Sequence, residues 1–275
     1  MTARPRLRIG AHRVRVLLAH FLVNLRDQGA YVGEVALGGG ILVVFLFILG
    51  TLWEATYRAQ GAETLGGLTW PQMTWYVTFT EAMVMSRVNV ARRIDEDVRT
   101  GDVAYALLRP GGYLTSRLGA YLAERLVRFL FTLTLGAIVA MVIAGPIAIH
   151  PSAGAAALLV AAGAFLLEFV IVAGIGLGAF WMEDTSSIYF VYTRVSMLLG
   201  GLLIPIELFP DSIASVARIL PFAPMIHGPA RLALADDASG LLPAMASLVA
   251  SMSVAGALVA VTYRVALARL TVHGG

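Results

Sequence analysis

Residues 153–181 read AGAAALLVAAGAFLLEFVIVAGIGLGAFW, and Glu168 is the only charged residue in this stretch. An α-helix needs about 20 apolar residues to cross the hydrocarbon core of a bilayer. In the whole chain of 275 residues, 59% are hydrophobic and 13% are charged, so a water-soluble fold would have more apolar surface than it could bury. The sequence therefore predicts an all-α, polytopic membrane protein.

Five further segments on either side of this stretch are also apolar enough to predict membrane spans. The six expected transmembrane helices comprise residues 31–52, 70–89, 118–144, 153–181, 188–204 and 241–267. The remaining residues are too few for a soluble catalytic domain. We therefore expect residues 1–275 to form a single transmembrane domain.

The distribution of arginine predicts the orientation of the chain. All 20 basic residues are arginine. With the N-terminus in the cytoplasm, 14 of them fall on the inner side of the expected spans, whereas Arg58, Arg218 and Arg231 fall on the outer side. Cytoplasmic loops of membrane proteins are enriched in basic residues, so we expect both termini in the cytoplasm.

Residues 1–29 are expected to form a cytoplasmic amphipathic helix. From Val14 to Leu25 the apolar residues recur at steps of three and four, and Arg13, Arg15 and Arg26 fall elsewhere on the helical wheel. This pattern is typical of a helix that lies in the membrane interface. The alternative is a basic leader that only sets the topology.

Residues 205–240 are apolar but rich in proline, since the stretch from Pro205 to Pro243 holds six of the eleven prolines. Proline interrupts a helix, so this segment cannot be one straight helix. We interpret it as an external re-entrant helical hairpin that precedes the last span. An ordinary amphipathic external loop would show the same pattern.

The longest charged segment, residues 91–117, reads ARRIDEDVRTGDVAYALLRPGGYLTSR. Its acidic and basic residues alternate, which indicates an ordered surface rather than a disordered tail. We expect a short helix from about Asp95 that breaks at Gly101, and a second one from Asp102 to Leu108. The segment is expected on the cytoplasmic side.

The chain lacks the residues that nucleotide or metal chemistry requires. The phosphate-binding loop of ATPases needs a lysine, and the sequence contains none. The five histidines, at 12, 20, 150, 227 and 273, have no metal-ligand spacing. Gly174 and Gly178 have the spacing of close helix packing. We therefore expect no enzyme activity and no catalytic, cofactor-binding or metal-binding residue.

Charged residues inside the expected spans are candidates for a translocation path, because each costs up to about 3 kcal/mol at the bilayer centre. They either line a polar path or form buried ion pairs, for example between Glu168 and Arg194. For Glu34 and Arg194, which lie close to the inner boundary, snorkelling of the side chain to that boundary is a third alternative. Three further charged residues, Glu124, Arg125 and Arg128, are expected on a solvated internal extension of the third span. The candidates for the path are Glu34, Glu81, Glu168 and Arg194.

Four stretches of the chain are distinctive: the basic helix from about Arg13 to Arg26, GDVAYALLRPGGYL at 101–114, GGLLIPIELFP at 200–210 and ARILPFAPMIHGPARLAL at 217–234. Together they resemble the membrane (permease) subunits of bacterial type-2 ATP-binding-cassette exporters, in the branch that includes antibiotic and drug exporters.

The resemblance implies that residues 91–117 couple the chain to a separate ATPase subunit, which binds the ATP. It also implies a second permease subunit, identical or homologous, export of a hydrophobic or amphipathic compound, and a multi-pass location in the bacterial plasma (inner) membrane. A charged loop that only fixes the topology remains the alternative for 91–117. The residues expected to contact the ATPase are Arg92, Arg93, Asp95, Glu96, Asp97, Arg99, Asp102 and Arg109.

Two other functions are compatible with a bundle of spans. A proton-coupled secondary transporter could use Glu34, Glu81 or Glu168 to relay protons. Such carriers often contain inverted repeats, and the two halves of this sequence show no convincing similarity. A membrane-embedded enzyme is the more distant alternative, because no catalytic constellation is visible.

Overall fold

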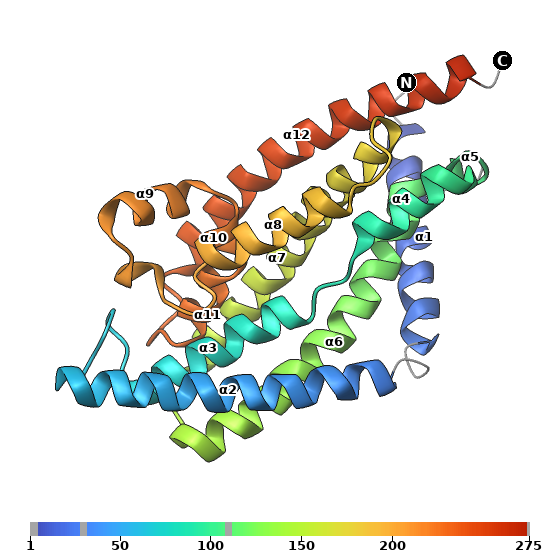
Figure 1. Ribbon diagram of the computed structural model, residues 1–275. Coiled ribbons are helices and arrows are strands. Elements are labelled where there is room, and N and C mark those ends of the chain that lie inside the picture. The colour runs from blue at the N-terminus through green and yellow to red at the C-terminus, as the bar shows by residue number, and fades with distance from the viewer. Residues whose placement is uncertain (1–4, 28–31, 108–111, 274–275) are drawn as a thin grey trace.

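The computed structural model describes residues 5–27, 32–107 and 112–273, and these residues are almost entirely helical (Figure 1). No β-strand occurs in the described ranges, where Leu65 and Leu68 form only an isolated bridge. The α-helices are α1 (Pro5–Asp27), α2 (Val32–Gln60), α3 (Trp70–Met85), α4 (Val90–Thr100), α5 (Asp102–Leu107), α6 (Tyr113–Ala144), α7 (Pro151–Leu177), α8 (Ser186–Leu199), α9 (Asp211–Ile219), α10 (Phe222–Met225), α11 (His227–Ala233) and α12 (Leu241–His273). Two short 3₁₀-helices, η2 (Gly178–Phe180) and η3 (Ile206–Leu208), complete the described elements.

Four described helices are long and apolar enough to cross a membrane. They comprise Gly38–Gln60 in α2, Tyr113–Ala144 in α6, Pro151–Phe180 in α7 with η2, and Leu241–Ala266 in α12. The expected spans 70–89 and 188–204 correspond to the shorter helices α3 and α8, which have 16 and 14 residues. At 1.5 Å per residue these helices are only about 24 and 21 Å long, less than the roughly 30 Å of a hydrocarbon core.

Local sequence explains where the shorter helices begin and end. The backbone N–H of Thr69 donates a 2.9 Å hydrogen bond to the side chain of Gln72, which caps the start of α3. At the other end of the second expected span, the side chain of Asn89 accepts a hydrogen bond from the backbone N–H of Arg92 and begins α4. Because of this cap, α4 begins five residues before the expected Asp95. It ends at Gly101, which has a φ of 79° that favours glycine.

The helix α8 ends in a similar way. Gly201, two residues after its last residue, has a φ of 75°, and Pro205 follows. A left-handed glycine is a common way to end a helix. The chain then continues as short elements rather than as further turns of α8.

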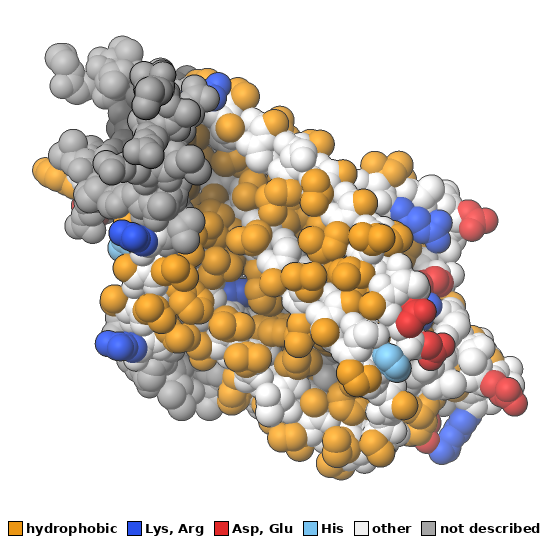
Figure 2. Space-filling view, turned by 180° about the vertical axis from the view of Figure 1, so that it is seen from behind, with side chains coloured by type: hydrophobic (Ala, Val, Ile, Leu, Met, Phe, Trp, Pro, Cys, Tyr) orange, Lys and Arg blue, Asp and Glu red, His pale blue; other side chains and the backbone are white. Residues whose placement is uncertain are grey.

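Opposite ends of the molecule carry different elements (Figure 1). The helices α1, α4 and α5 and the C-terminal part of α12 gather at one end. The connection between α2 and α3 lies at the other end, together with α9. Figure 2 shows hydrophobic side chains across the middle of the back face, with charged side chains near both ends. This distribution is the one expected of a protein that crosses a membrane along its long axis.

The core lies around α7, which packs against α12, α11 and α4. Aromatic rings join it to its neighbours: the centroid of Phe165 lies 5.2 Å from that of Phe129 on α6, and the Phe129 centroid lies 5.9 Å from that of Phe79 on α3. The edge-on geometry of both pairs adds to the packing. The three helices α3, α6 and α7 therefore share one buried aromatic row.

The helix α1 packs closely on α6. A Cβ atom added to Gly119 would lie 2.8 Å from the backbone oxygen of Leu17, so only glycine permits this approach. The expected cytoplasmic helix is thus seated on the bundle through the described part of α1.

The proline-rich segment forms η3, α9, α10 and α11 instead of one straight helix. An ion pair anchors it: Nε of Arg231 lies 2.9 Å from Oε1 of Glu207, and Nε2 of His227 lies 3.5 Å from the same oxygen. Burial raises the pKa of Glu207, but the hydrogen bond from His227 and the nearby positive charges outweigh it, and the pKa falls to about 2. The second ring nitrogen of His227, Nδ1, lies 3.0 Å from the hydroxyl of Tyr76 on α3.

Candidate functional site

The helix α4 is amphipathic, and its two faces have different surroundings. Val90, Ala91 and Ile94 are buried, and a Cβ atom added to Gly176 of α7 would lie only 2.8 Å from the Cβ of Ile94. On the opposite face, Arg92 and Glu96 are exposed and form an ion pair of 2.8 Å. The apolar face is thus fixed to the bundle, and the charged face is free to meet another molecule.

Two of the residues expected to contact an ATPase, Arg93 and Asp97, form ion pairs that join α4 to α6. Nη1 of Arg93 lies 2.8 Å from Oε2 of Glu124. The carboxylate of Asp97 accepts hydrogen bonds from the hydroxyl of Tyr113 and from the guanidinium of Arg117. These contacts fix the helix α4 on α6.

The expected contact residues differ in how accessible they are. Asp95 is 7% exposed and is paired with Arg99, whose Nη2 lies 3.3 Å from its carboxylate. Asp102 is exposed at the start of α5 and accepts a 2.9 Å hydrogen bond from the hydroxyl of Thr100. Arg109 lies outside the described residues.

A groove of about 460 Å³ opens beside α4, toward the connection between α7 and α8. Arg99 spans it, because Nη2 also lies 3.8 Å from Oδ1 of Asp184. Asp184 accepts hydrogen bonds from the side chain and the backbone N–H of Ser186. These bonds, and the charge of Arg99, lower the pKa of Asp184. The groove therefore presents a carboxylate that stays ionised near neutral pH.

Residues 183–186 fall between the expected spans 153–181 and 188–204, on the side expected to be cytoplasmic, and Asp184 was not among the expected contact residues. The position of Asp184 in the chain could have pointed to a contact with residues 91–117, because both segments were expected on the cytoplasmic side. The structure brings the two together in one groove.

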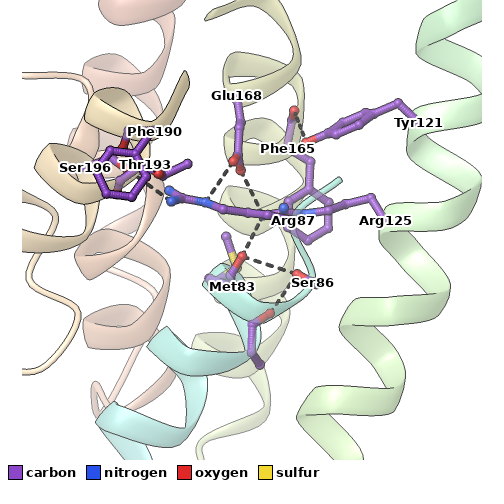
Figure 3. Close-up of polar contacts among 11 residues, drawn as sticks. Met83, Ser86, Arg87, Tyr121, Arg125, Phe165, Glu168, Phe190, Thr193 and Ser196 are labelled. Carbon is purple, nitrogen blue, oxygen red and sulfur yellow. Dashed lines mark hydrogen bonds and ion pairs between the residues drawn. The ribbon is translucent and has the colours of Figure 1, made fainter. Parts of the chain in front are cut away.

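A second cluster lies deeper in the bundle, around Glu168 of α7 (Figure 3). Oε1 of Glu168 lies 2.8 Å from Nε of Arg87, which follows α3, and Oε2 lies 2.9 Å from Nη2 of Arg125 on α6. Arg87 also donates a 3.0 Å hydrogen bond to the hydroxyl of Ser196 on α8. Arg125 donates a 2.6 Å hydrogen bond to the backbone oxygen of Met83. One carboxylate thus links α3, α6, α7 and α8.

This cluster corrects two expectations. Glu168 pairs with Arg87 and Arg125, and the pairing with Arg194 that was considered from the sequence is wrong. Arg125 is 1% exposed, so the expected solvated face is also wrong, because this side of α6 packs against α3 and α7. Glu124 is likewise buried and is held by Arg93 and Arg128.

The partners of Glu168 were missed by sequence reasoning, since Arg87 was counted as a cytoplasmic residue. It nevertheless falls within the expected span 70–89, where a charged side chain requires a buried counter-charge.

The other path candidates lie apart from this cluster. Glu81 of α3 is 4% exposed, and its Oε1 has no hydrogen-bond partner in the described part of the chain. Arg194 of α8 is exposed, with its guanidinium carbon 5.1 Å from the ring centroid of Phe190. The side chain of Glu34 lies outside the described residues. No ion pair joins Glu81, Glu168 and Arg194 to one another.

The site as a whole has the features of a mechanical connection rather than of a reaction centre. A charged, exposed helix is anchored to the ends of membrane-spanning helices, and buried ion pairs continue inward from it. A search of curated proteins finds no match to the chain. The family model described as ABC-2 family transporter protein matches residues 40–274, so the chain belongs to the ABC-2 transporter family as a multi-pass membrane subunit.

Proposed function

We propose that this chain is the membrane-spanning subunit of an ATP-driven exporter. With a second permease subunit, it forms the path by which a hydrophobic or amphipathic compound leaves the cytoplasm or the inner leaflet. Permeases of the ABC-2 family do not hydrolyse ATP themselves, and the family implies an ATPase partner. The observation that carries the proposal is the geometry of α4, which is locked to α7 on one face and charged on the other.

The ATPase docks on the exposed charges of α4 and in the groove beside it. The accessible residues for this contact are Arg92, Glu96, Arg99, Asp102 and Asp184. Arg93 and Asp97 also take part in coupling the ATPase to the bundle. Their ion pairs with Glu124 and Arg117 transmit a displacement of α4 to α6. Close packing at Gly176 passes it to α7.

The chain crosses the membrane six times in this proposal. The four long helices cross fully, and α3 and α8 complete their crossings with residues 86–89 and 200–204. The end that carries α1, α4 and α5 faces the cytoplasm, in keeping with the excess of arginine there. Residues 205–240 form the external re-entrant segment, both termini are cytoplasmic, and the membrane is the bacterial plasma membrane.

The second permease subunit covers exposed apolar faces of α2 and α8. On α2, Val44 and Phe47 are each 59% exposed, and on α8, Leu198 is 71% exposed. In lipid, helices associate through packing of such surfaces and through hydrogen bonds between them. The two subunits then enclose the path between their α2 and α8 helices.

Family membership favours this proposal over a proton-coupled carrier that uses Glu34, Glu81 or Glu168. Glu168 is also held by two guanidinium groups. These two ion pairs account for the buried charge of Glu168 without a proton-relay role.

The proposal is tested by purifying the tagged chain from its native host and identifying the proteins that accompany it. Wild-type protein should retain an ATP-hydrolysing chain. The double variant Arg92→Glu/Glu96→Arg keeps the ion pair within α4 but reverses the charges that it presents, so retention of the ATPase should fall about tenfold. That ratio corresponds to about 1.4 kcal/mol of lost contact energy.

Arg218→Glu, on exposed α9 at the opposite end, is the matched control and should retain the ATPase. Transport should stop when ATP is depleted. If no ATPase accompanies the wild-type chain and transport survives ATP depletion, the proposal is wrong.

A further inference from the structure

A groove of about 350 Å³ lies between α2 and α8 and continues along the segment that follows α8. Phe45 contributes from α2, Met197 and Leu198 from α8, and Leu203 and Phe209 from the following segment. These side chains are apolar. Arg194 is the single charged residue in the lining of the groove.

Arg194 differs from the two arginines at the centre of the bundle. Arg87 and Arg125 share the carboxylate of Glu168, whereas no side chain that the structure describes forms an ion pair with Arg194. Its guanidinium instead lies over the ring of Phe190, one turn closer to the start of α8. A cation at membrane depth is costly without a counter-charge, so the groove offers an unused binding partner for an anion.

The groove is polarised along the axis of α8. Among the residues of α8 that line the groove, Arg194 is the one nearest the start of the helix, which the proposed orientation places at the cytoplasmic side. Leu203 and Phe209 lie beyond its other end. A lipid of the inner leaflet has the same polarity, with its headgroup at the cytoplasmic surface and its chain directed toward the membrane centre.

We infer that this groove binds an amphiphile with a phosphate headgroup, whose chain lies along Met197 and Leu203 and whose phosphate is held by Arg194. This inference rests on the proposed function and names its substrate class, a lipid-like anion taken from the inner leaflet. A guanidinium can donate two parallel hydrogen bonds to a phosphate. The volume is at the small end of ligand pockets, roughly 300–1,000 Å³, which suits a single acyl chain.

The test is photolabelling of the purified complex in nanodiscs of phosphatidylcholine. The probes are lysophosphatidylglycerol and lysophosphatidylcholine with the same diazirine-bearing acyl chain, together with an amine of the same chain. The anionic probe should label peptides that contain Phe45 and Met197 about tenfold more than the other two. Hydrogen bonds to charged groups contribute enough for a factor of this size.

Arg194→Gln should reduce labelling by the anionic probe to the level of the zwitterionic one, whereas Arg194→Lys should keep most of it because the charge remains. Arg218→Gln removes one exposed arginine elsewhere and should have no effect. Thermal unfolding of each variant shows that it is folded. The same anionic probe should stimulate ATP hydrolysis by the complex with wild-type permease and fail to do so with Arg194→Gln.

Equal labelling by the three headgroups, or normal labelling of Arg194→Gln, overturns the inference. The proposed subunit contact predicts that Leu198→Cys cross-links two permease subunits. Absence of groove labelling in subunits that cross-link efficiently overturns the inference, because the second subunit then fills the groove instead of bordering it. The native chain contains no cysteine, so this cross-link is specific. A failure of the proposed function gives a different result from a failure of this inference. In that case no ATPase accompanies the chain during purification, while photolabelling of the permease can still be measured.

Discussion

At the scale of single residues, the position of Glu168 between two arginines has a measurable energetic consequence. Arg87 and Arg125 are almost fully buried, so removing the carboxylate charge leaves two cations without a counter-charge. Breaking a buried ion pair from one side costs about 3–5 kcal/mol. Glu168→Gln should therefore lower the thermal stability of the purified protein strongly.

The matched control for this prediction is Glu54→Gln, which removes the carboxylate of an exposed pair with Arg58. Exposed pairs contribute about 0–1 kcal/mol, so this variant should unfold almost like the wild type. The double variant Glu168→Gln/Arg125→Gln should recover part of the loss, because one uncompensated cation is removed. Equal melting temperatures for Glu168→Gln and Glu54→Gln would contradict the structural assignment.

At the scale of helices, the contact between α4 and α7 depends on a missing side chain. A Cβ atom at Gly176 would meet the Cβ of Ile94 at 2.8 Å and the backbone oxygen of Ala91 at 2.9 Å. Gly176→Ala should therefore displace α4 and weaken the coupling of ATP hydrolysis to transport. The expected result is a fall in transported substrate per ATP hydrolysed, while the protein still inserts into the membrane.

Gly256→Ala in α12 is the control, because nothing lies within 4 Å of the position of its Cβ. Alanine stabilises a helix by roughly 1 kcal/mol relative to glycine, so this variant should be neutral or slightly stabilised. An unchanged ratio of transport to hydrolysis in Gly176→Ala would show that this contact does not transmit the movement of α4.

The hydrophobic pattern of the sequence predicts some helices better than others. Hydrophobic runs located α2, α6, α7 and α12, because a span needs a long apolar stretch. They did not reveal that α3 and α8 are shorter than a membrane crossing, since Gly201 and the residues after Met85 end the helices within apolar sequence. The break at Gly101 was predictable, because a left-handed glycine ends a helix locally.

The partners of charged residues could not be predicted in the same way. Glu168 meets Arg87 and Arg125 only after three helices have packed together, and sequence spacing does not determine that packing. For the same reason, the sequence predicted residues 91–117 as a contact segment without showing that Arg93 and Asp97 form ion pairs with α6. It placed Asp184 and α4 on the same side of the membrane but could not show that they form one groove.

At the scale of the whole molecule, the two charged ends should lie on opposite sides of the membrane. The chain has no cysteine, so single substitutions can be labelled without background. Glu96→Cys on α4 should react with a membrane-impermeant maleimide only in inside-out vesicles. Arg58→Cys, near the end of α2, should react only in intact cells.

This experiment also bears on the proposed function, because an ATPase acts only from the cytoplasm. Reaction of Glu96→Cys in intact cells would place α4 outside and leave no surface for an ATPase. Reaction of both variants from the same side would contradict the arrangement of the helices in Figure 1.

The ion pairs around Glu168 have a consequence for how such a subunit can move. They join four segments at a level close to α4, so in the proposed exporter the end that carries α4 should move as one rigid block. The opposite end is held by a more exposed ion pair between Glu207 and Arg231, which water can reach and replace. If the proposed function holds, the bundle turns about the two arginines, and the opening that releases the substrate is expected at the end that carries Glu207.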